Sequence, residues 1–155
     1  MSERITLFAE VILPLPLPST YTYRIPYEWN DLIKVGQRVA VQLRNKKIYS
    51  GLVRNVHSNA PNVQSVKYIL SILDPDPIVS EKSFKLWQWI ASYYMCYLGD
   101  VMSIALPSAL RLRSETKVII NPDFDGDVTN LEEDESLIIE SLAKKEALSI
   151  DDVNK

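Results

Sequence analysis

Three prolines alternate with leucines near the start of the chain, and this stretch restricts the fold more than any other. Residues 13–18 read Leu-Pro-Leu-Pro-Leu-Pro. Each proline fixes its own φ and pushes the residue before it out of the helical region. Each also lacks the N–H that a strand ladder uses. We therefore expect a stiff, extended segment that runs along the edge of a sheet.

The residues after the prolines alternate as a half-buried strand does. Tyr21, Tyr23 and Ile25 occupy every second position, with Thr22 and Arg24 between them. One interpretation is a strand end that presents a tyrosine ring at the surface. The other is a proline-bent edge strand with core tyrosines, and spacing alone favours it because buried strand aromatics are common. The sequence leaves this choice open.

Four further stretches have the strand period, and a helix follows them. The stretches are 4–12, 38–43, 48–57 with Gly51 as a bulge, and 67–73. About five strands at regular spacing predict a small barrel or strongly curved sheet. A helical face should cover this sheet, with Ser80 as its N-cap and Gly99 at its end. The residues expected on that face are Phe84, Trp87, Ala91 and Tyr94.

The other aromatic residues predicted on this helix are Trp89, Tyr93 and Tyr97. At helical spacing, we interpret them as core residues in preference to a ligand-binding surface.

Residues 100–106 predict a second short helix. A strand is expected at 117–121 and a helix at 132–146, with Leu137, Ile138 and Leu142 as its apolar stripe. Ser149 should then cap a helical fragment, which resembles the start of a helix-turn-helix unit. The fold class is therefore α+β.

Charge divides the chain into two parts. Residues 1–107 hold 11 Lys and Arg against 8 Asp and Glu, a net charge of +3. Residues 108–155 hold 6 against 12, a net charge of −6. A mildly basic first part is able to hold a few phosphates but not a long duplex. No signal-peptide pattern and no membrane-length apolar run are present, which predicts a cytoplasmic protein with no membrane partner.

No catalytic, cofactor or metal motif is visible. A phosphate-binding loop of the form G-x-x-x-x-G-K-[ST] is absent. The single cysteine, Cys96, permits neither an internal disulfide nor a cysteine-based zinc site. The only histidine, His57, has no nucleophile motif beside it. The acidic run at 123–127 has its glycine at the wrong position for a calcium loop. We expect no enzyme activity, no cofactor and no metal in this chain.

Several strings together closely resemble the N-terminal region of the PriA family. They are Leu-Pro-Leu-Pro-x-Thr-Tyr-x-Tyr at 15–23, Val-Gly-x-Arg-Val-x-Val at 35–41, Tyr-Tyr at 93–94, Gly-Asp-Val at 99–101 and Ala-Leu-Pro at 105–107. This family comprises the bacterial replication-restart helicases, also called primosomal protein N′. The resemblance covers roughly residues 6–107, in the family's order and spacing.

The resemblance implies three parts: a DNA 3′-end-binding domain at 1–107, a linker with a short strand at 108–131, and the truncated start of a winged-helix domain at 132–155. The family's ATPase lobes and zinc insertion would then lie beyond Lys155. The sequence is expected to be the N-terminal piece of an ATP-dependent 3′-to-5′ DNA helicase, in which ATP and zinc belong to the missing part.

The resemblance also implies a pocket for the last base of a DNA strand. Tyr21 matches the family's pocket aromatic residue and Lys67 its basic residue. Thr22 replaces a family Asp, and Arg44 replaces the glycine of a Pro-Phe-Gly turn, so two of the four positions depart from the pattern. Lys46 and Lys47 would supply supporting phosphate contacts.

The implied function is recognition of DNA structure during replication restart. The chain would bind the 3′ end of the nascent leading strand at a stalled fork, without regard to sequence, and orient the helicase for primosome assembly. Single-strand-binding protein and other primosome proteins are further expected partners beside branched DNA. The alternative is a protein-interaction barrel of the primosome, with DNA held by other domains.

Overall fold

The computed structural model describes residues 5–44, 47–62, 65–112, 117–122, 124, 132–145 and 147–149. Contacts divide the chain into two compact units, Met1–Ser114 and Glu115–Lys155. Within the described ranges, no helix is long and apolar enough to cross a membrane.

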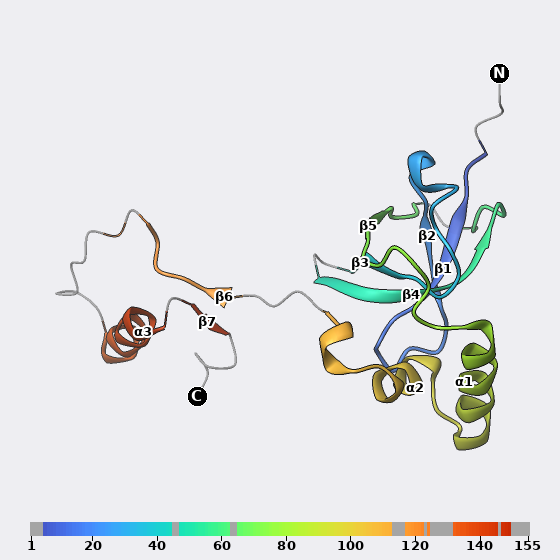
Figure 1. Ribbon diagram of the computed structural model, residues 1–155. Coiled ribbons are helices and arrows are strands. Elements are labelled where there is room, and N and C mark those ends of the chain that lie inside the picture. The colour runs from blue at the N-terminus through green and yellow to red at the C-terminus, as the bar shows by residue number, and fades with distance from the viewer. Residues whose placement is uncertain are drawn as a thin grey trace. The chain divides into compact units, whose positions relative to one another are not determined.

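The first unit is built on one antiparallel sheet with the strand order β2-β1-β4-β3-β5 (Figure 1). Its strands are β1 (Phe8–Ile12), β2 (Tyr21–Arg24), β3 (Arg38–Leu43), β4 (Lys47–His57) and β5 (Ile69–Ile72). The sheet curves until its two outer strands approach each other. A parallel bridge joins Arg24 to Tyr68, and the Arg24 N–H donates to the Lys67 carbonyl oxygen at 2.8 Å. The predicted strongly curved sheet and the α+β class are confirmed.

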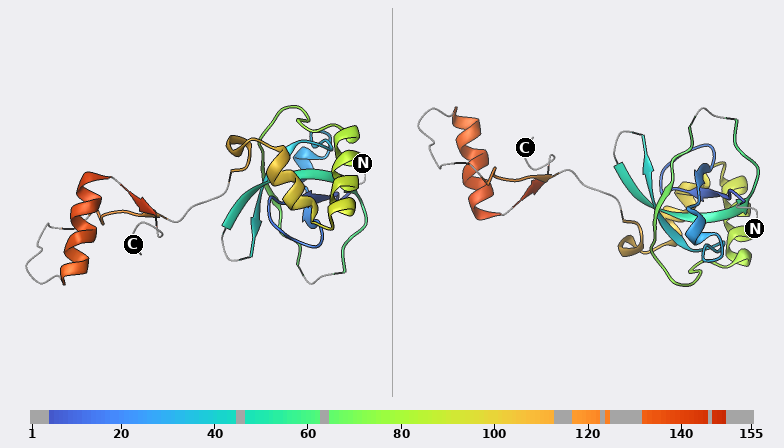
Figure 2. Two further views of the ribbon diagram at one scale, coloured as in Figure 1. Left: turned by 90° about the horizontal axis from the view of Figure 1, so that it is seen from below. Right: turned by 90° about the horizontal axis from the view of Figure 1, so that it is seen from above.

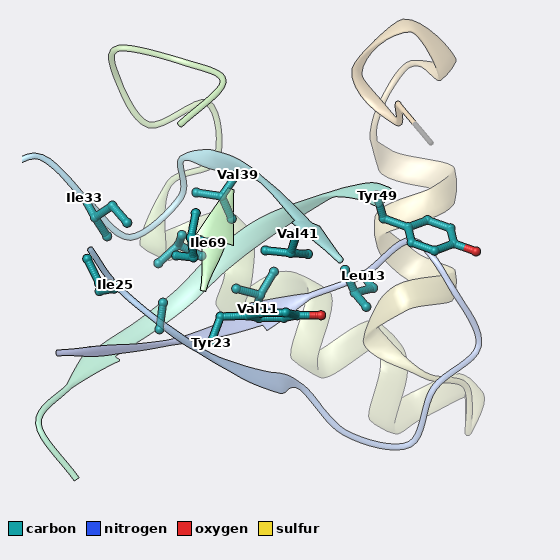
Figure 3. Close-up of a cluster of buried hydrophobic side chains, with 11 residues drawn as sticks. Val11, Leu13, Tyr23, Ile25, Ile33, Val39, Val41, Tyr49 and Ile69 are labelled. Carbon is teal, nitrogen blue, oxygen red and sulfur yellow. The ribbon is translucent and has the colours of Figure 1, made fainter. Parts of the chain in front are cut away.

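The inside of the curve holds the first hydrophobic core (Figure 3). Alternate residues of the strands point into it, as the period-2 pattern predicts. Tyr23 lies among the aliphatic side chains of this core, and Tyr49 lies at one end beside Leu13 (Figure 3). The buried members of the cluster are Ala9, Val11, Leu13, Tyr23, Ile25, Ile33, Val39, Val41, Tyr49, Val53 and Ile69.

Two helices, α1 (Glu81–Tyr94) and α2 (Leu98–Ala105), lie side by side at one end of the sheet (Figures 1 and 2). Ser80 caps α1 as predicted, since its Oγ accepts the Ser83 N–H at 3.2 Å. A second core lies between these helices and the sheet. Its buried members are Ile12, Leu52, Val79, Phe84, Trp87, Ala91, Val101, Met102 and Leu106. Two short 3₁₀ turns, η1 (Tyr27–Trp29) and η2 (Ser108–Leu110), complete the unit.

The end of α1 differs from the prediction. The helix stops at Tyr94, and Met95 takes the left-handed conformation (φ 52°) that we expected a glycine to provide. Gly99 instead lies within α2. A Cβ at Gly99 would collide with the carbonyl oxygens of Leu13 and Leu15, so the glycine lets α2 approach the proline segment closely.

The predicted position of Tyr94 on the covered face was wrong. Its side chain is 68% exposed and packs edge-on against Tyr93, with 4.9 Å between ring centroids. Phe84, Trp87 and Ala91 are buried as predicted. Tyr94 is the last residue of the helix, and its ring finds an aromatic neighbour on α1 rather than on the sheet.

The proline segment is not extended, which corrects the expectation for residues 13–18. The Leu15 N–H donates to the Leu13 carbonyl oxygen, and the Leu17 N–H to that of Leu15, each at 2.8 Å. Bonds between residues two apart define γ-turns, here centred on Pro14 and Pro16. The fixed φ of proline suits the inverse γ-turn. The N–H groups of Leu15 and Leu17 are therefore satisfied within the segment itself rather than by a neighbouring strand.

Gly51 is not a bulge. It stays in register opposite Val39, while the irregularity lies between Glu10 and Val11 of β1, where Arg54 is the extra residue on β4. A Cβ at Gly51 would collide with Val11. Gly51 therefore allows β1 to pack closely against β4.

The second unit consists of α3 (Glu133–Lys144) and a two-stranded ladder of β6 (Lys117–Val118) and β7 (Leu148–Ser149). Leu142 is buried as predicted, but Leu137 is 61% exposed and does not belong to the apolar stripe. Ser149 pairs with Lys117 in the ladder. The fragment that Ser149 was expected to cap, residues 150–153, lies outside the described residues. The three-part division at 107 and 131 stays a prediction.

Candidate nucleic-acid interface

An open hollow of about 360 Å³ lies where β2 begins and β3 ends. We call it the β2–β3 hollow. The bridge that closes the half-barrel brings the chain before β5 to its rim, because it holds Lys67 and Tyr68 against β2. The residues that line it are Thr20, Tyr21, Thr22, Tyr23, Gln42, Leu43, Arg44, Pro61, Ser65, Val66 and Lys67.

The two tyrosines of β2 have different environments. Tyr23 is only 3% exposed, and its hydroxyl donates to the Gln42 carbonyl oxygen at 3.2 Å. Burial, followed by the neighbouring Tyr21, raises the pKa of Tyr23 to about 12. Tyr21 is half-buried at the first position of the strand, where it packs against the first core and lines the hollow. Tyr23 is therefore a core residue, and Tyr21 is the ring within reach of a ligand.

Lys67 and Arg44 meet at the rim. The Lys67 ammonium donates to the Arg44 carbonyl oxygen at 2.7 Å. Arg44 has φ 47°, a left-handed conformation that glycine adopts freely and that costs another residue about 1–2 kcal/mol. The hydrogen bond from Lys67 helps to hold this turn. The backbone at Arg44 thus has the conformation of a glycine position, although the residue has a long cationic side chain.

The other predicted site residues are divided between two places. Thr22 lines the β2–β3 hollow. Lys47, the exposed first residue of β4, lines a neighbouring hollow of about 650 Å³. We call this second one the hairpin hollow, and its lining residues are Leu15, Pro16, Leu17, Leu43, Arg44, Lys47 and Tyr49. Lys46 lies outside the described residues.

The charge of both hollows has one sign. Arg44, Lys47 and Lys67 line them, and their described linings contain no carboxylate. In the part of the chain that the structure describes, the side chains of Arg44 and Lys47 make no hydrogen bond or ion pair. An aromatic ring beside unpaired cations suits a planar, anionic ligand. Among the described residues, no group of three or more His, Cys, Asp or Glu is arranged to hold a metal ion.

Sequence reasoning missed an exposed aromatic cluster on α1. Trp89 and Tyr93 are 59% and 66% exposed, and their rings stack with 5.2 Å between centroids. Tyr97, before α2, is 46% exposed. Interpreting these residues as core was wrong. A helix turns about 200° over two residues, so Trp89 is on the side opposite to the buried Trp87, and this spacing was the available signal. Sequence reasoning also missed four residues that line the β2–β3 hollow, and no comparable signal pointed to them. They are Thr20, Pro61, Ser65 and Val66.

The fold is that of a basic half-barrel domain followed by a small α/β unit, and comparison with known families identifies both. Residues 10–107 match the PriA family described as the 3′DNA-binding domain (3′BD). Residues 115–155 match the family described as the winged helix domain. Since the first match covers more than half of the chain, this chain belongs to the PriA 3′DNA-binding-domain family, as its sequence strings predicted.

Similar proteins bear the name replication restart protein PriA. The chain is 31% identical to that of Chlamydia trachomatis over 115 residues, which cover 72% of this chain and 15% of the relative. It is 26% identical to that of Bacillus subtilis over 149 residues, 92% of this chain and 18% of the relative. For Haemophilus influenzae the identity is 31% over 101 residues, 65% of this chain and 14% of the relative. The chain thus spans less than a fifth of these relatives.

Proposed function

We propose that this chain binds the free 3′ end of a DNA strand, without regard to sequence, in the β2–β3 hollow. The observation that supports this best is the half-buried ring of Tyr21, which lines a hollow beside the cations Lys67 and Arg44. The described lining of this hollow has no carboxylate. Membership of the PriA 3′DNA-binding-domain family supports the same ligand.

The residues of the hollow would contact different parts of the terminal nucleotide. A terminal base has one face free of neighbours, so it stacks on Tyr21, which contributes about 1–3 kcal/mol for one base. Lys67 and Arg44 neutralise the last phosphates, which carry no sequence information. The Thr22 hydroxyl, which lines the hollow, is able to donate and accept a hydrogen bond to the ligand but has no charge, so it does not repel phosphate as an aspartate would.

In the cell, this ligand would be the nascent leading strand at a stalled replication fork. Holding that end would orient the rest of a longer PriA protein for primosome assembly, in the cytoplasm. We propose that the chain itself neither hydrolyses ATP nor unwinds DNA, because its sequence has no phosphate loop. DNA-stimulated ATP turnover by the purified chain, above that of a mock purification, would contradict this part of the proposal.

The direct test compares forked DNA with and without a 3′-ended leading strand at the junction. We expect tighter binding to the fork that presents the end, and weaker binding when its 3′-hydroxyl is replaced by a bulky blocking group. Equal affinity for all three ligands would show that the hollow does not recognise an end.

A second candidate is a protein-interaction module whose partner is single-strand-binding protein or another primosome protein. The exposed Trp89–Tyr93 stack on α1 favours it, because exposed aromatic patches commonly mark protein interfaces. Salt separates the two functions. Binding to phosphates weakens steeply as salt rises, whereas an apolar protein interface does not.

A further inference from the structure

The hairpin hollow extends the DNA site beyond the terminal nucleotide. It adjoins the β2–β3 hollow, because Leu43 and Arg44 line both. The β2–β3 hollow has a volume of about 360 Å³ and the hairpin hollow one of about 650 Å³. Both volumes lie within the range of small-molecule sites. Two neighbouring hollows with a shared cationic border are what two consecutive nucleotides require.

The lining of the hairpin hollow has the two kinds of surface that a nucleotide contacts. Leu15 and Leu17 are half-buried and provide apolar surface next to Tyr49. Lys47 is exposed at the start of β4 and provides positive charge. Apolar contact suits a base or sugar, and the ammonium suits its phosphate.

Arg44 is the residue between the two hollows. Its backbone is held in the left-handed region, with the carbonyl oxygen bound by Lys67, while its guanidinium makes no hydrogen bond or ion pair within the described ranges. Strained backbone held by its surroundings often marks a functional position. A guanidinium binds phosphate through two parallel hydrogen bonds, so an unpaired arginine at a border suits a bridging phosphate.

We propose that the hairpin hollow binds the nucleotide on the 5′ side of the terminal one, and that Arg44 binds the phosphate between them. This inference rests on the proposed function, since it needs the terminal nucleotide in the β2–β3 hollow. The inference adds a second subsite to the proposed one. It also implies that Arg44, at a position where the family has a glycine, increases affinity for DNA. The site then distinguishes a strand end with a phosphodiester behind it from a single nucleotide.

Modified DNA tests the role of the phosphate. The full chain is titrated with 5′-labelled single strands of ten nucleotides that carry one uncharged methylphosphonate linkage. We expect binding that is weaker by roughly tenfold or more when the last linkage is uncharged, because the charge-assisted hydrogen bonds between Arg44 and the phosphate are then lost. The same change in the middle of the strand should have a much smaller effect. Equal effects at both positions would overturn the proposal.

A variant assigns this effect to Arg44. Arg44→Gly removes the cation and keeps the left-handed turn, so we expect an unchanged or higher melting temperature. It should bind the unmodified strand roughly tenfold more weakly and lose the penalty for the last uncharged linkage. Lys85→Ala, which removes an exposed cation from α1, is the matched control and should keep that penalty. A penalty that persists in Arg44→Gly would exclude Arg44 as the phosphate ligand.

An abasic site at the penultimate position tests the hollow itself. We expect it to weaken binding about three- to tenfold in the unmodified protein, within the range for one stacked or packed base. Lys47→Ala should lower affinity for a 5′-phosphorylated dinucleotide while leaving that for a 5′-phosphorylated mononucleotide unchanged, because only the dinucleotide places a phosphate beside Lys47. No effect of the abasic site, together with retained 3′-end preference, would overturn the second subsite alone. If the unmodified protein showed no preference for a 3′ end at all, the proposed function would be overturned as well.

Discussion

The two ends of β3 hold cationic side chains in opposite ways. At the first residue of the strand, Arg38 is 8% exposed and each of the three nitrogens of its guanidinium donates a hydrogen bond. Just after the last residue, Arg44 is exposed beside an open hollow, and its side chain has no partner within the described part of the chain. One strand therefore connects a structural arginine with one that is available to a ligand.

The Arg38 end joins three segments of the first unit. Its Nε and Nη2 donate to the two oxygens of Asp74, each at 2.7 Å, and Nη1 donates to the Leu110 carbonyl oxygen at 3.0 Å. Gln37, 1% exposed, donates to the carbonyl oxygens of Asp74 and Pro75. Buried polar groups must find partners, and these do. This end fastens the loop before α1 and the chain after α2 to the sheet.

Burial and hydrogen bonding separate the structural cation at one end of β3 from the available cation at the other end. A cation that is buried and fully hydrogen-bonded stabilises the fold, and its removal leaves partners unsatisfied. A cation that is exposed, unpaired and next to a ring contributes little to the fold and is available for phosphate. Variants at the two ends should therefore move stability and DNA affinity independently.

The largest expected effect is on stability at the Arg38 end. Arg38→Ala should lower the free energy of unfolding by about 3–5 kcal/mol, because it leaves the Asp74 carboxylate without its partner. Thermal or urea unfolding measures this. Lys34→Ala breaks the exposed Lys34–Asp76 pair and serves as the control, with little change expected. If Arg38→Ala also abolished 3′-end preference at a temperature where it is folded, the two ends would not be separable.

The second prediction concerns acid. Hydrogen bonds from Arg38 hold the pKa of the Asp74 carboxyl below its usual value, against the opposing effect of burial. The stabilisation is therefore complete above the unfolded pKa, about 3.9, and is lost as pH falls through the lower folded value. Asp74→Asn should cost about 1.5–3 kcal/mol at pH 7. Its stability should also fall less than that of the original chain below about pH 4. The free energy of unfolding is measured against pH for both proteins. If it fell in parallel for the two below about pH 4, the coupling between Arg38 and Asp74 would be contradicted.

The third prediction concerns the ring at the open end of the site. Tyr21→Ala should lose about 1–3 kcal/mol of affinity for DNA with a free 3′ end, and Tyr21→Phe should retain most of it, because stacking uses the ring face. Binding to a fork without that end should hardly change. Tyr23→Ala is the contrast, since it removes a buried ring and should cost about 3–5 kcal/mol of stability. A destabilised Tyr21→Ala with full 3′-end preference would refute the assignment of Tyr21.

The smallest expected effect is that of Lys67. Lys67→Met keeps the length of the side chain and removes its charge and its bond to the Arg44 carbonyl oxygen. It should weaken binding to every terminal base alike and reduce the slope of log affinity against log salt by about one unit. Lys82→Met on α1 is the matched control, with no change of slope expected. An unchanged slope in folded Lys67→Met would remove Lys67 from the site.

Much of the local structure could be predicted from the sequence. Strand and helix periods located the five strands of the half-barrel and α1, and the Ser80 cap followed from its position before an acidic first turn. Local rules failed where a distant segment decided the conformation. Gly99 and Gly51 looked like a helix end and a bulge, but each is a place where another backbone or side chain passes too closely for a Cβ.

The amino-acid pattern was enough to predict which residues alternate, three of the residues on the covered face of α1, and the family to which the chain belongs. It also placed Tyr21 at the first position of a strand, but it did not decide which tyrosine of that strand is buried. The folding of the whole sheet places Tyr23 in the core, and it brings Lys67 to the Arg44 carbonyl oxygen, 23 residues away in the chain. The physical reason is that the sheet curves until β2 meets the chain before β5, and this closure depends on the packing of the whole core rather than on any local pattern.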